Sequence, residues 1–420
     1  MHKIFFITQG CSNNVADTET MQGILQKEGY GIVQTAEQAD LIVINSCTVK
    51  NATEKDFFRC LKALPKKPIV IAGCIAQTDP EKLPEVSLLG TTQINNITYV
   101  VEQTLQGNRI ILTKKENNQR LNLPKIRKNP IIEIIPINRG CLGSCTFCKT
   151  KAARFNLLSF ETEAILQQIK TAVNQGIKEI WLTSQDTAVY GLDIGCTLPI
   201  LLQKILALDG TFMVRLGMGN PDHFKLYINE LAEIFRHPKM FKFLHIPIQA
   251  GNNAVLNAMK RNYTKEEFFE IVQKLRKKIS EITIATDIIC GFPYETDEQF
   301  NETLDVVKQL QFDVINISRY SARPKTLAAA FPQHNGRIIA GRSKRLTQLF
   351  ESLLPSINQK WIGWQGIIII DDYGKKGTQT MLGRNYTYKQ VVVKGDFKLG
   401  EMPKVKIVKV DEYSLYGDVL

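Results

Sequence analysis

The sequence has no uninterrupted run of about eighteen apolar residues, so no segment is expected to span a membrane. Its opening stretch, residues 1–7, is too short for a signal peptide and leads directly into the polar residues Thr8 and Gln9. These two absences favour a cytoplasmic protein. In that compartment, nine cysteines indicate metal or redox chemistry rather than disulfides.

Histidine is also scarce, and none lies between His2 and His223. Within that gap, directly after the apolar residues 131–137, a CxxxCxxC run is formed by Cys141, Cys145 and Cys148. A structural zinc needs a fourth ligand, whereas the neighbouring side chains here are basic. Three thiolates on a four-iron cluster leave one iron open, as chemistry at a cluster requires. A zinc clip or three packed thiols remain the alternatives.

Acidic residues are the minority among the charged ones. The 420 residues include 53 Lys and Arg against 41 Asp and Glu, which gives a net charge of +12. Such an excess suggests a polyanionic partner. The length is sufficient for two or three domains.

The first third of the chain alternates short apolar strands with helices, which predicts an open, mostly parallel sheet. Three cysteines follow the predicted strands 4–8, 41–45 and 69–72: Cys11, Cys47 and Cys74. Because the ends of parallel strands meet at one crevice, these thiols are expected to converge and could form a second three-thiolate site. Buried packing is the alternative for each cysteine. We also expect a helix over residues 17–28 with Thr18 as its cap, and a packed thiol at Cys60.

From about residue 131 to 350 a repeated strand-then-helix pattern predicts a full or partial α/β barrel. Chemistry in that fold lies at the carboxyl ends of strands. The candidate residues there are Ser184, Gln185, Asp186, Gln249 and Ile288. Asp186 could equally be a helix or turn cap. Cys196 and Cys290 are expected to be structural.

Residues 355–363 resemble a boundary, and the short strands expected beyond them predict a small β-barrel. The strands are expected at residues 366–371, 378–382, 390–393 and 405–410.

Three segments are strongly basic. Residues 108–130 contain a single acid, Glu116, and read either as a solvated connector or as a phosphate-contacting strap. Residues 149–154 directly follow the CxxxCxxC run, and residues 319–345 contain no acid. With the basic and aromatic stretch 383–389, they supply the expected RNA contacts: Lys149, Lys151, Arg154, Arg323, Arg384 and Tyr386.

The CxxxCxxC run, with Phe147 before its last cysteine, resembles the signature of the radical S-adenosylmethionine (SAM) superfamily. The segments around Cys11, Cys47 and Cys74 (residues 10–14, 45–49 and 72–77) resemble the three cluster-binding motifs of the methylthiotransferases. The C-terminal part resembles the RNA-binding TRAM domain. Residues 141–154 resemble the archaeal and eukaryotic branch that makes the methylthio derivative of N6-threonylcarbamoyladenosine beside the tRNA anticodon. That branch usually has glycine where this chain has Phe155.

The resemblance implies three domains: a methylthiotransferase domain over residues 1–120, a radical-SAM domain over 131–350 and a TRAM-like domain over 358–420. It implies two 4Fe-4S clusters. One, on Cys141, Cys145 and Cys148, cleaves SAM so that a radical takes hydrogen from adenine carbon 2. The other, on Cys11, Cys47 and Cys74, carries a sulfur that a further SAM methylates before delivery. Phe147, Ser184, Gln185, Asp186, Gln249 and Ile288 would bind SAM.

The implied partners are tRNA and a flavodoxin- or ferredoxin-like electron donor, with an unspecified sulfur donor. A ribosomal protein, or isopentenyladenosine in tRNA, is an alternative substrate for the same architecture. A non-catalytic, zinc-containing RNA-binding protein is a second alternative.

Overall fold

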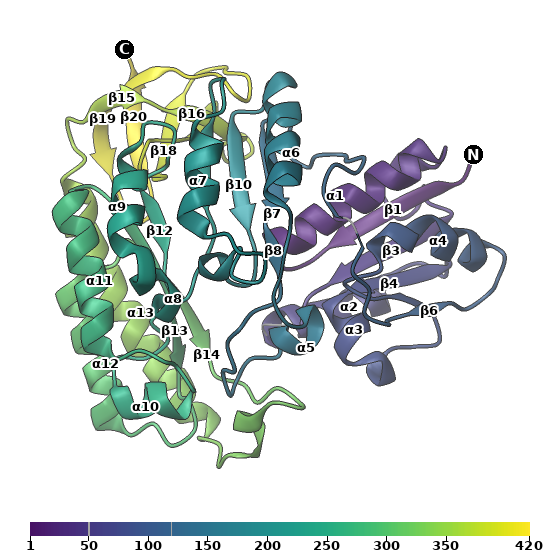
Figure 1. Cartoon of the computed structure of the whole chain (residues 1–420), viewed down its shortest axis with the longest axis horizontal. Helices are drawn as coiled ribbons and strands as arrows, with labels where there is room; N and C mark the ends of the chain where they lie inside the picture. The colour runs from purple at the N-terminus through teal and green to yellow at the C-terminus, as the bar shows by residue number, and fades with distance from the viewer. Residues whose placement is uncertain (49–50, 119) are drawn as a thin grey trace.

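The computed structural model describes residues 1–48, 51–118 and 120–420. Val49, the last residue of one predicted cluster motif, lies outside them. In Figure 1 the N-terminal sheet lies to the right of the larger central region, and the C-terminal strands, in yellow, lie at the upper left. No helix in the described residues is long and apolar enough to cross a membrane.

The N-terminal region is the predicted open sheet, and all of its strand pairs are parallel. Its order is β2 (Gly31–Val33), β1 (Lys3–Thr8), β3 (Leu41–Ser46), β4 (Ile69–Gly73), β5 (Ser87–Leu89) and β6 (Ile111–Leu112). Alternate apolar residues of β3 and β4 enter two separate cores, one on each face. Sheets buried on both faces require such continuous apolar strands. The helices are α1 (Ser12–Lys27), α2 (Asn51–Ala63), α3 (Cys74–Thr78) and α4 (Ile97–Leu105).

Helix α1 begins at Ser12, whereas the sequence predicted a start at residue 17 with Thr18 as the cap. That prediction is wrong because the polar first turn is buried against other parts of the protein. Ser12 Oγ lies 2.7 Å from Thr183 Oγ1, and Asn14 Nδ2 donates to the Ser46 carbonyl at 2.8 Å. Tertiary contacts therefore satisfy the polar side chains of this first turn.

The central region has two adjoining three-stranded parallel sheets. They contain β7 (Ile132–Pro136), β10 (Glu179–Thr183) and β11 (Met213–Leu216), then β12 (Phe243–His245), β13 (Thr283–Cys290) and β14 (Val314–Arg319). A bridge between Val214 and Met240 joins the two sheets. The flanking helices include α6 (Thr162–Asn174), α7 (Leu198–Leu206), α9 (Ile228–Arg236), α11 (Lys265–Lys278), α12 (Asp297–Leu310) and α13 (Gly336–Gln359). This alternation is the α/β pattern that the sequence predicted.

The segment before β7 is not a loose connector. Lys125 Nζ lies 2.6 Å from a carboxylate oxygen of the buried Glu133, and Arg127 Nε lies 2.5 Å from the other. Arg120, also buried, pairs with Asp17 of α1. The positive charges of this segment therefore fasten it between the N-terminal and central regions, and both the solvated-connector and phosphate-strap interpretations are wrong for these three side chains.

The C-terminal strands form one curled sheet. The order is β15 (Gln365–Ile367), β19 (Lys404–Val410), β20 (Leu415–Val419), β18 (Gln390–Lys394), β17 (Thr380–Arg384) and β16 (Ile369–Tyr373). Strands β15 and β16 are separated in the chain only by Ile368, yet they stand at opposite ends of this order, so the sheet bends round on itself. The predicted boundary, residues 355–363, contains the end of α13, which continues through Pro355 to Gln359.

Candidate iron–sulfur site between two cysteine trios

Cys11, Cys47 and Cys74 stand just past the carboxyl ends of β1, β3 and β4, as the sequence predicted. Gly10 allows a close approach, because a Cβ there would lie 2.7 Å from Cys47 Cβ. Burial raises the pKa of the Cys74 thiol to about 11, Arg154 opposes this rise, and Cys47 and Cys11 add to it. Cys47 and Cys74 are buried, while Cys11 is exposed. The structure therefore brings the three thiols to one end of the sheet.

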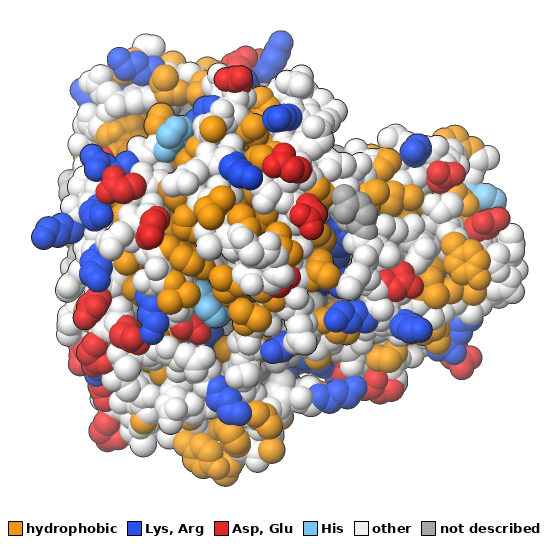
Figure 2. Space-filling model, in the orientation of Figure 1, with side chains coloured by type: hydrophobic (Ala, Val, Ile, Leu, Met, Phe, Trp, Pro, Cys, Tyr) orange, Lys and Arg blue, Asp and Glu red, His pale blue; other side chains and the backbone are white. Residues whose placement is uncertain are grey.

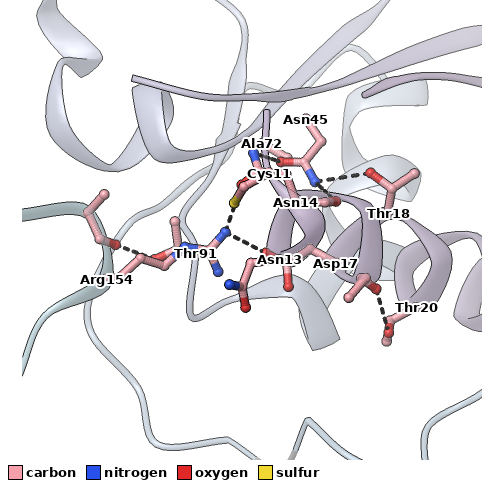
Figure 3. Close-up of polar contacts among 12 residues, drawn as sticks. Cys11, Asn13, Asn14, Asp17, Thr18, Thr20, Asn45, Ala72, Thr91 and Arg154 are labelled. Carbon is pink, nitrogen blue, oxygen red and sulfur yellow. Dashed lines mark hydrogen bonds and ion pairs between the residues drawn. The ribbon is translucent and has the colours of Figure 1, made fainter. Parts of the chain in front are cut away.

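Asparagine side chains hold the loops of this trio together (Figure 3). Asn45 Nδ2 donates to the Asn14 carbonyl at 2.8 Å and to Thr18 Oγ1 at 3.0 Å. Asn14 Oδ1 lies 3.6 Å from the Cys11 sulfur. Because Asn14, Thr18 and Asn45 are buried, these bonds fix the strand ends from which the thiols project.

The second trio lies in the loop between β8 (Asn138–Arg139) and α5 (Thr150–Arg154). Its sulfurs accept hydrogen bonds from nitrogen donors. Gly143 N donates to Cys141 Sγ at 3.2 Å, and Arg261 Nη1 donates to Cys145 Sγ at 3.2 Å. Burial, followed by the charge of Asp186, raises the pKa of Cys141 to about 12. Phe147 packs edge-on against Phe292, which anchors the loop to the central core.

The three residues expected to bind the SAM amino group directly follow β10, and two of them, Gln185 and Asp186, lie beside this loop. Gln185 Oε1 accepts from Gly140 N at 2.7 Å, and Ser184 Oγ accepts from Asp186 N at 2.8 Å. Asp186 is fully buried and accepts from Ala188 N at 3.1 Å, which confirms its role as a cap. Gln185 thus contacts the start of the cysteine loop, whereas Ser184 bonds within its own turn.

Gln249 and Ile288 are neighbours, as a bridge between their backbones shows. Gln249 is half-buried and has a positive φ of 71°. Ile288 is buried and its side chain packs in the central core.

Asn220 and Arg261 are site residues that sequence reasoning missed. Arg261 Nη2 donates to Asn220 Oδ1 at 2.6 Å, and Asn220 Nδ2 donates to Asp186 at 2.5 Å and approaches Cys141 Sγ at 3.8 Å. Asn220 lies in the glycine-rich turn 217–221, a sequence signal that could have suggested it. Arg261 follows a short helix, α10 (Asn253–Ala258), and has no comparable signal.

The expected RNA contacts are wrong for Lys149, Arg154 and Arg323, because these cations are buried in ion pairs with acids of the N-terminal region. The partners are Asp79, Asp17 and Glu54 respectively. Burying a charge requires such pairing.

The other expected RNA contacts also bond within the protein. Lys151 is half-buried and donates to the Gly143 carbonyl at 3.0 Å. Arg384 pairs with Asp371 at 2.8 Å, and Tyr386 packs against Trp364.

In the part of the chain that the structure describes, no three His, Cys, Asp or Glu side chains are arranged to hold a single metal ion. A four-iron cluster asks for a different arrangement, because each thiolate binds its own iron atom and hydrogen-bond donors to sulfur suit the negative charge. Nitrogen donors to sulfur are present at both trios, Gly143 and Arg261 at one and Arg154 at the other. The residues present therefore fit iron–sulfur clusters.

Two family models match the parts of the chain that contain the two cysteine trios. Residues 3–89 match the uncharacterized protein family UPF0004, and residues 135–307 match the radical SAM superfamily. The solved structure of the radical SAM methyltransferase TsrM from Kitasatospora setae shares the fold, with a TM-score of 0.58 at 14% identity over 78% of this chain and 77% of that one. The radical enzyme OxsB gives a TM-score of 0.53 at 13% identity, over 86% of this chain and 56% of OxsB.

Relatives with known names cover nearly the whole chain. The probable threonylcarbamoyladenosine tRNA methylthiotransferase of Pyrococcus abyssi is 39% identical over 96% of this chain and 97% of its own length. The human and Xenopus laevis threonylcarbamoyladenosine tRNA methylthiotransferases are each 41% identical over 99% of this chain, and over 74% and 76% of their own lengths. The chain therefore belongs to the radical-SAM family of threonylcarbamoyladenosine tRNA methylthiotransferases.

Proposed function

We propose that this protein adds a methylthio group to carbon 2 of N6-threonylcarbamoyladenosine next to the anticodon of tRNA, using SAM and two 4Fe-4S clusters. The observation that carries the proposal is the presence of two separate cysteine trios linked by a single short helix. Helix α5 begins two residues after Cys148 and packs against α3, which begins at Cys74. Two reactions on one substrate need two centres that lie near each other, because the bound substrate must reach both.

Cys141, Cys145 and Cys148 would hold the cluster at which SAM is cleaved. The chemistry that such a cluster supplies when bound is one-electron cleavage, which yields a radical able to break the unreactive C–H bond of adenine. The protein's part is orientation. Arg261 and Gly143 donate to the ligand sulfurs, while Asn220 links Arg261 to Asp186. Ser184, Gln185 and Gln249 would face SAM from the strand ends.

Cys11, Cys47 and Cys74 would hold the second cluster, whose role is to carry the sulfur that is methylated and transferred. Cys11 is the exposed member of this trio, whereas Cys47 and Cys74 are buried. This gradient suits a centre that is fixed on its protein side and open on its substrate side.

The C-terminal curled sheet would serve as a TRAM-like RNA-binding barrel. Its turn between β16 and β17 offers an exposed tyrosine, Tyr373, and two exposed lysines, Lys375 and Lys376. An aromatic ring beside cations suits base stacking with phosphate contact. On the face shown in Figure 2, further Lys and Arg side chains lie near the boundary between the N-terminal lobe and the rest of the molecule. A flavodoxin- or ferredoxin-like donor would supply the electron, and the cytoplasm would be the site of the reaction.

The test is mass spectrometry of nucleosides after incubation of anaerobically reconstituted protein with tRNA that carries threonylcarbamoyladenosine. The expected product is heavier by one methylthio group in place of hydrogen. Matched reactions contain isopentenyladenosine tRNA or ribosomal proteins. A product in one of those reactions alone would replace the proposed substrate, and zinc in place of iron would favour the non-catalytic alternative.

A further inference from the structure

Helix α5 is held at both ends by buried cations that reach into the N-terminal region. At its start, Lys149 pairs with Asp79, and at its end, Arg154 Nη2 lies 2.9 Å from Asp17 and 3.1 Å from Asn14 Oδ1. The side chain of Arg154 is 3% exposed. Figure 3 shows Arg154 meeting the residues that frame Cys11. Arg154 therefore lies in the central region of the sequence, but its side chain contacts residues around the N-terminal trio.

The acidic side chain that pairs with Arg154 does not neutralise the charge of all the buried arginines around it. Asp17 is shared by two buried arginines, Arg154 and Arg120. A third buried arginine, Arg139, bonds to the Glu116 carbonyl and the Asn117 side chain, which are both uncharged. Burial, followed by repulsion from Arg154 and Arg139, lowers the pKa of Arg120 well below its usual value. Buried charge is stable only when it is compensated, so this excess calls for a nearby anion.

The N-terminal trio lies where that anion is needed. Arg154 is within hydrogen-bonding reach of the Cys74 sulfur. Asn14 Oδ1, which accepts from Arg154, is also the atom that faces the Cys11 sulfur. Three thiolates bearing a cluster carry net negative charge, and they would balance the surplus cation directly.

We infer that Arg154 sets the redox potential of the Cys11–Cys47–Cys74 centre from within the radical-SAM domain, as a positioning residue that compensates the charge of the ligand sulfurs. A fixed positive charge stabilises the reduced, more negative form of a cluster and thus raises its potential. The inference rests on the proposed N-terminal cluster. It also means that the centre acquires its working potential only when α5 is docked.

The test is a redox titration, followed by electron paramagnetic resonance, of the full chain carrying Cys141→Ala, Cys145→Ala and Cys148→Ala, so that only the N-terminal centre binds iron. Adding Arg154→Gln should shift the midpoint potential to more negative values. At a fixed solution potential, the ratio of reduced to oxidised centre should fall by about tenfold or more. Arg154→Lys, which keeps the charge, should remain close to the parent. The matched control is Arg342→Gln. Arg342 is also a buried arginine, paired with Glu295 at 2.9 Å, but it is not part of the surroundings of the N-terminal trio.

The outcomes separate the two claims. A parent that binds no iron would overturn the proposed N-terminal cluster and this inference with it. A loaded centre whose potential is the same in parent and Arg154→Gln would overturn the inference alone. If Arg154→Gln loses iron, retention by Arg154→Lys supports the role of charge, whereas equal loss in Arg154→Lys contradicts it.

Discussion

Lys149 and Asp79 form an ion pair in which each side chain is only 1% exposed. Lys149 directly follows Cys148, and Asp79 ends the helix that begins at Cys74. One buried pair therefore fixes the loop that carries Cys148 against the helix that begins at Cys74.

Breaking this pair is expected to destabilise the protein strongly. Asp79→Asn should lower the free energy of unfolding by about 3–5 kcal/mol, because it leaves the buried Lys149 without a counter-charge. Lys149→Met should lower it by less, because Asp79 keeps Lys82 at 3.2 Å. The double variant should lose less than the sum of the two, since no unpaired charge remains. Urea denaturation measures all three values. Lys204→Met, which breaks an exposed pair with Glu163, is the control and should cost under about 1 kcal/mol.

Phe155 carries backbone strain at the position where the family usually has glycine. Its φ of 66° and ψ of −159° fall in a region that glycine alone adopts easily. The loop keeps this shape because the backbone at Asn156 packs against Gly140, where a Cβ would lie 2.1 Å from the Asn156 carbonyl oxygen. Phe155 is therefore held in a backbone conformation that glycine would adopt without strain.

Phe155→Gly should raise the free energy of unfolding by about 1 kcal/mol, after allowance for loss of the ring contact with Lys115. Phe155→Ala removes the ring but keeps the strained backbone, and should be less stable than Phe155→Gly by about 1–3 kcal/mol. Equal stability of the two variants, measured by urea denaturation, would show that residue 155 is not strained.

Much of this geometry could be predicted from the sequence, because strand ends and cysteine spacing are local features. The strand over residues 179–183 and the position of Cys11, Cys47 and Cys74 just past strand ends are examples. The partners of the charged residues could not be predicted. A run of basic residues looks the same in the sequence whether its side chains contact RNA or form ion pairs within the protein. Arg323, for example, pairs with Glu54 in a distant segment of the chain. Arg261 reaches Cys145 across more than a hundred residues of chain for the same reason.

Glu179 should make stability fall as the pH rises towards neutrality. Burial, and next the charge of Asp371, raise the pKa of Glu179 from 4.5 to about 7. A carboxyl with a raised pKa in the folded protein favours folding below the unfolded value, and this contribution is lost as the pH rises to the folded value. Between pH 4.5 and 7 the loss should reach about 2–3 kcal/mol.

Glu179→Gln should remove that part of the decline, because the amide can still accept the bond from Trp181 Nε1 and does not ionise. Urea denaturation at several pH values from 4.5 to 8 measures the slope. Glu230→Gln, an exposed position on α9, should keep the wild-type slope. If the stability of Glu179→Gln falls with pH as steeply as that of the wild type, the fall does not come from Glu179.

Cys11→Ala should abolish methylthio product while SAM cleavage at the first centre continues. The reason is that the role proposed for Cys11 is confined to the second centre, and its exposure makes the substitution mild for folding. Release of deoxyadenosine and formation of methylthio nucleoside are measured in the same reaction. Cys60→Ala, in α2, is the control and should retain both activities. Methylthio product at the normal rate from Cys11→Ala would remove Cys11 from the mechanism.

Iron content tests the existence of two centres most directly. Anaerobically reconstituted protein should hold about eight irons per chain. Replacing either trio, Cys11, Cys47 and Cys74 or Cys141, Cys145 and Cys148, by alanine should leave about four. Four irons in the unaltered chain, with none lost when the N-terminal trio is replaced, would contradict the account.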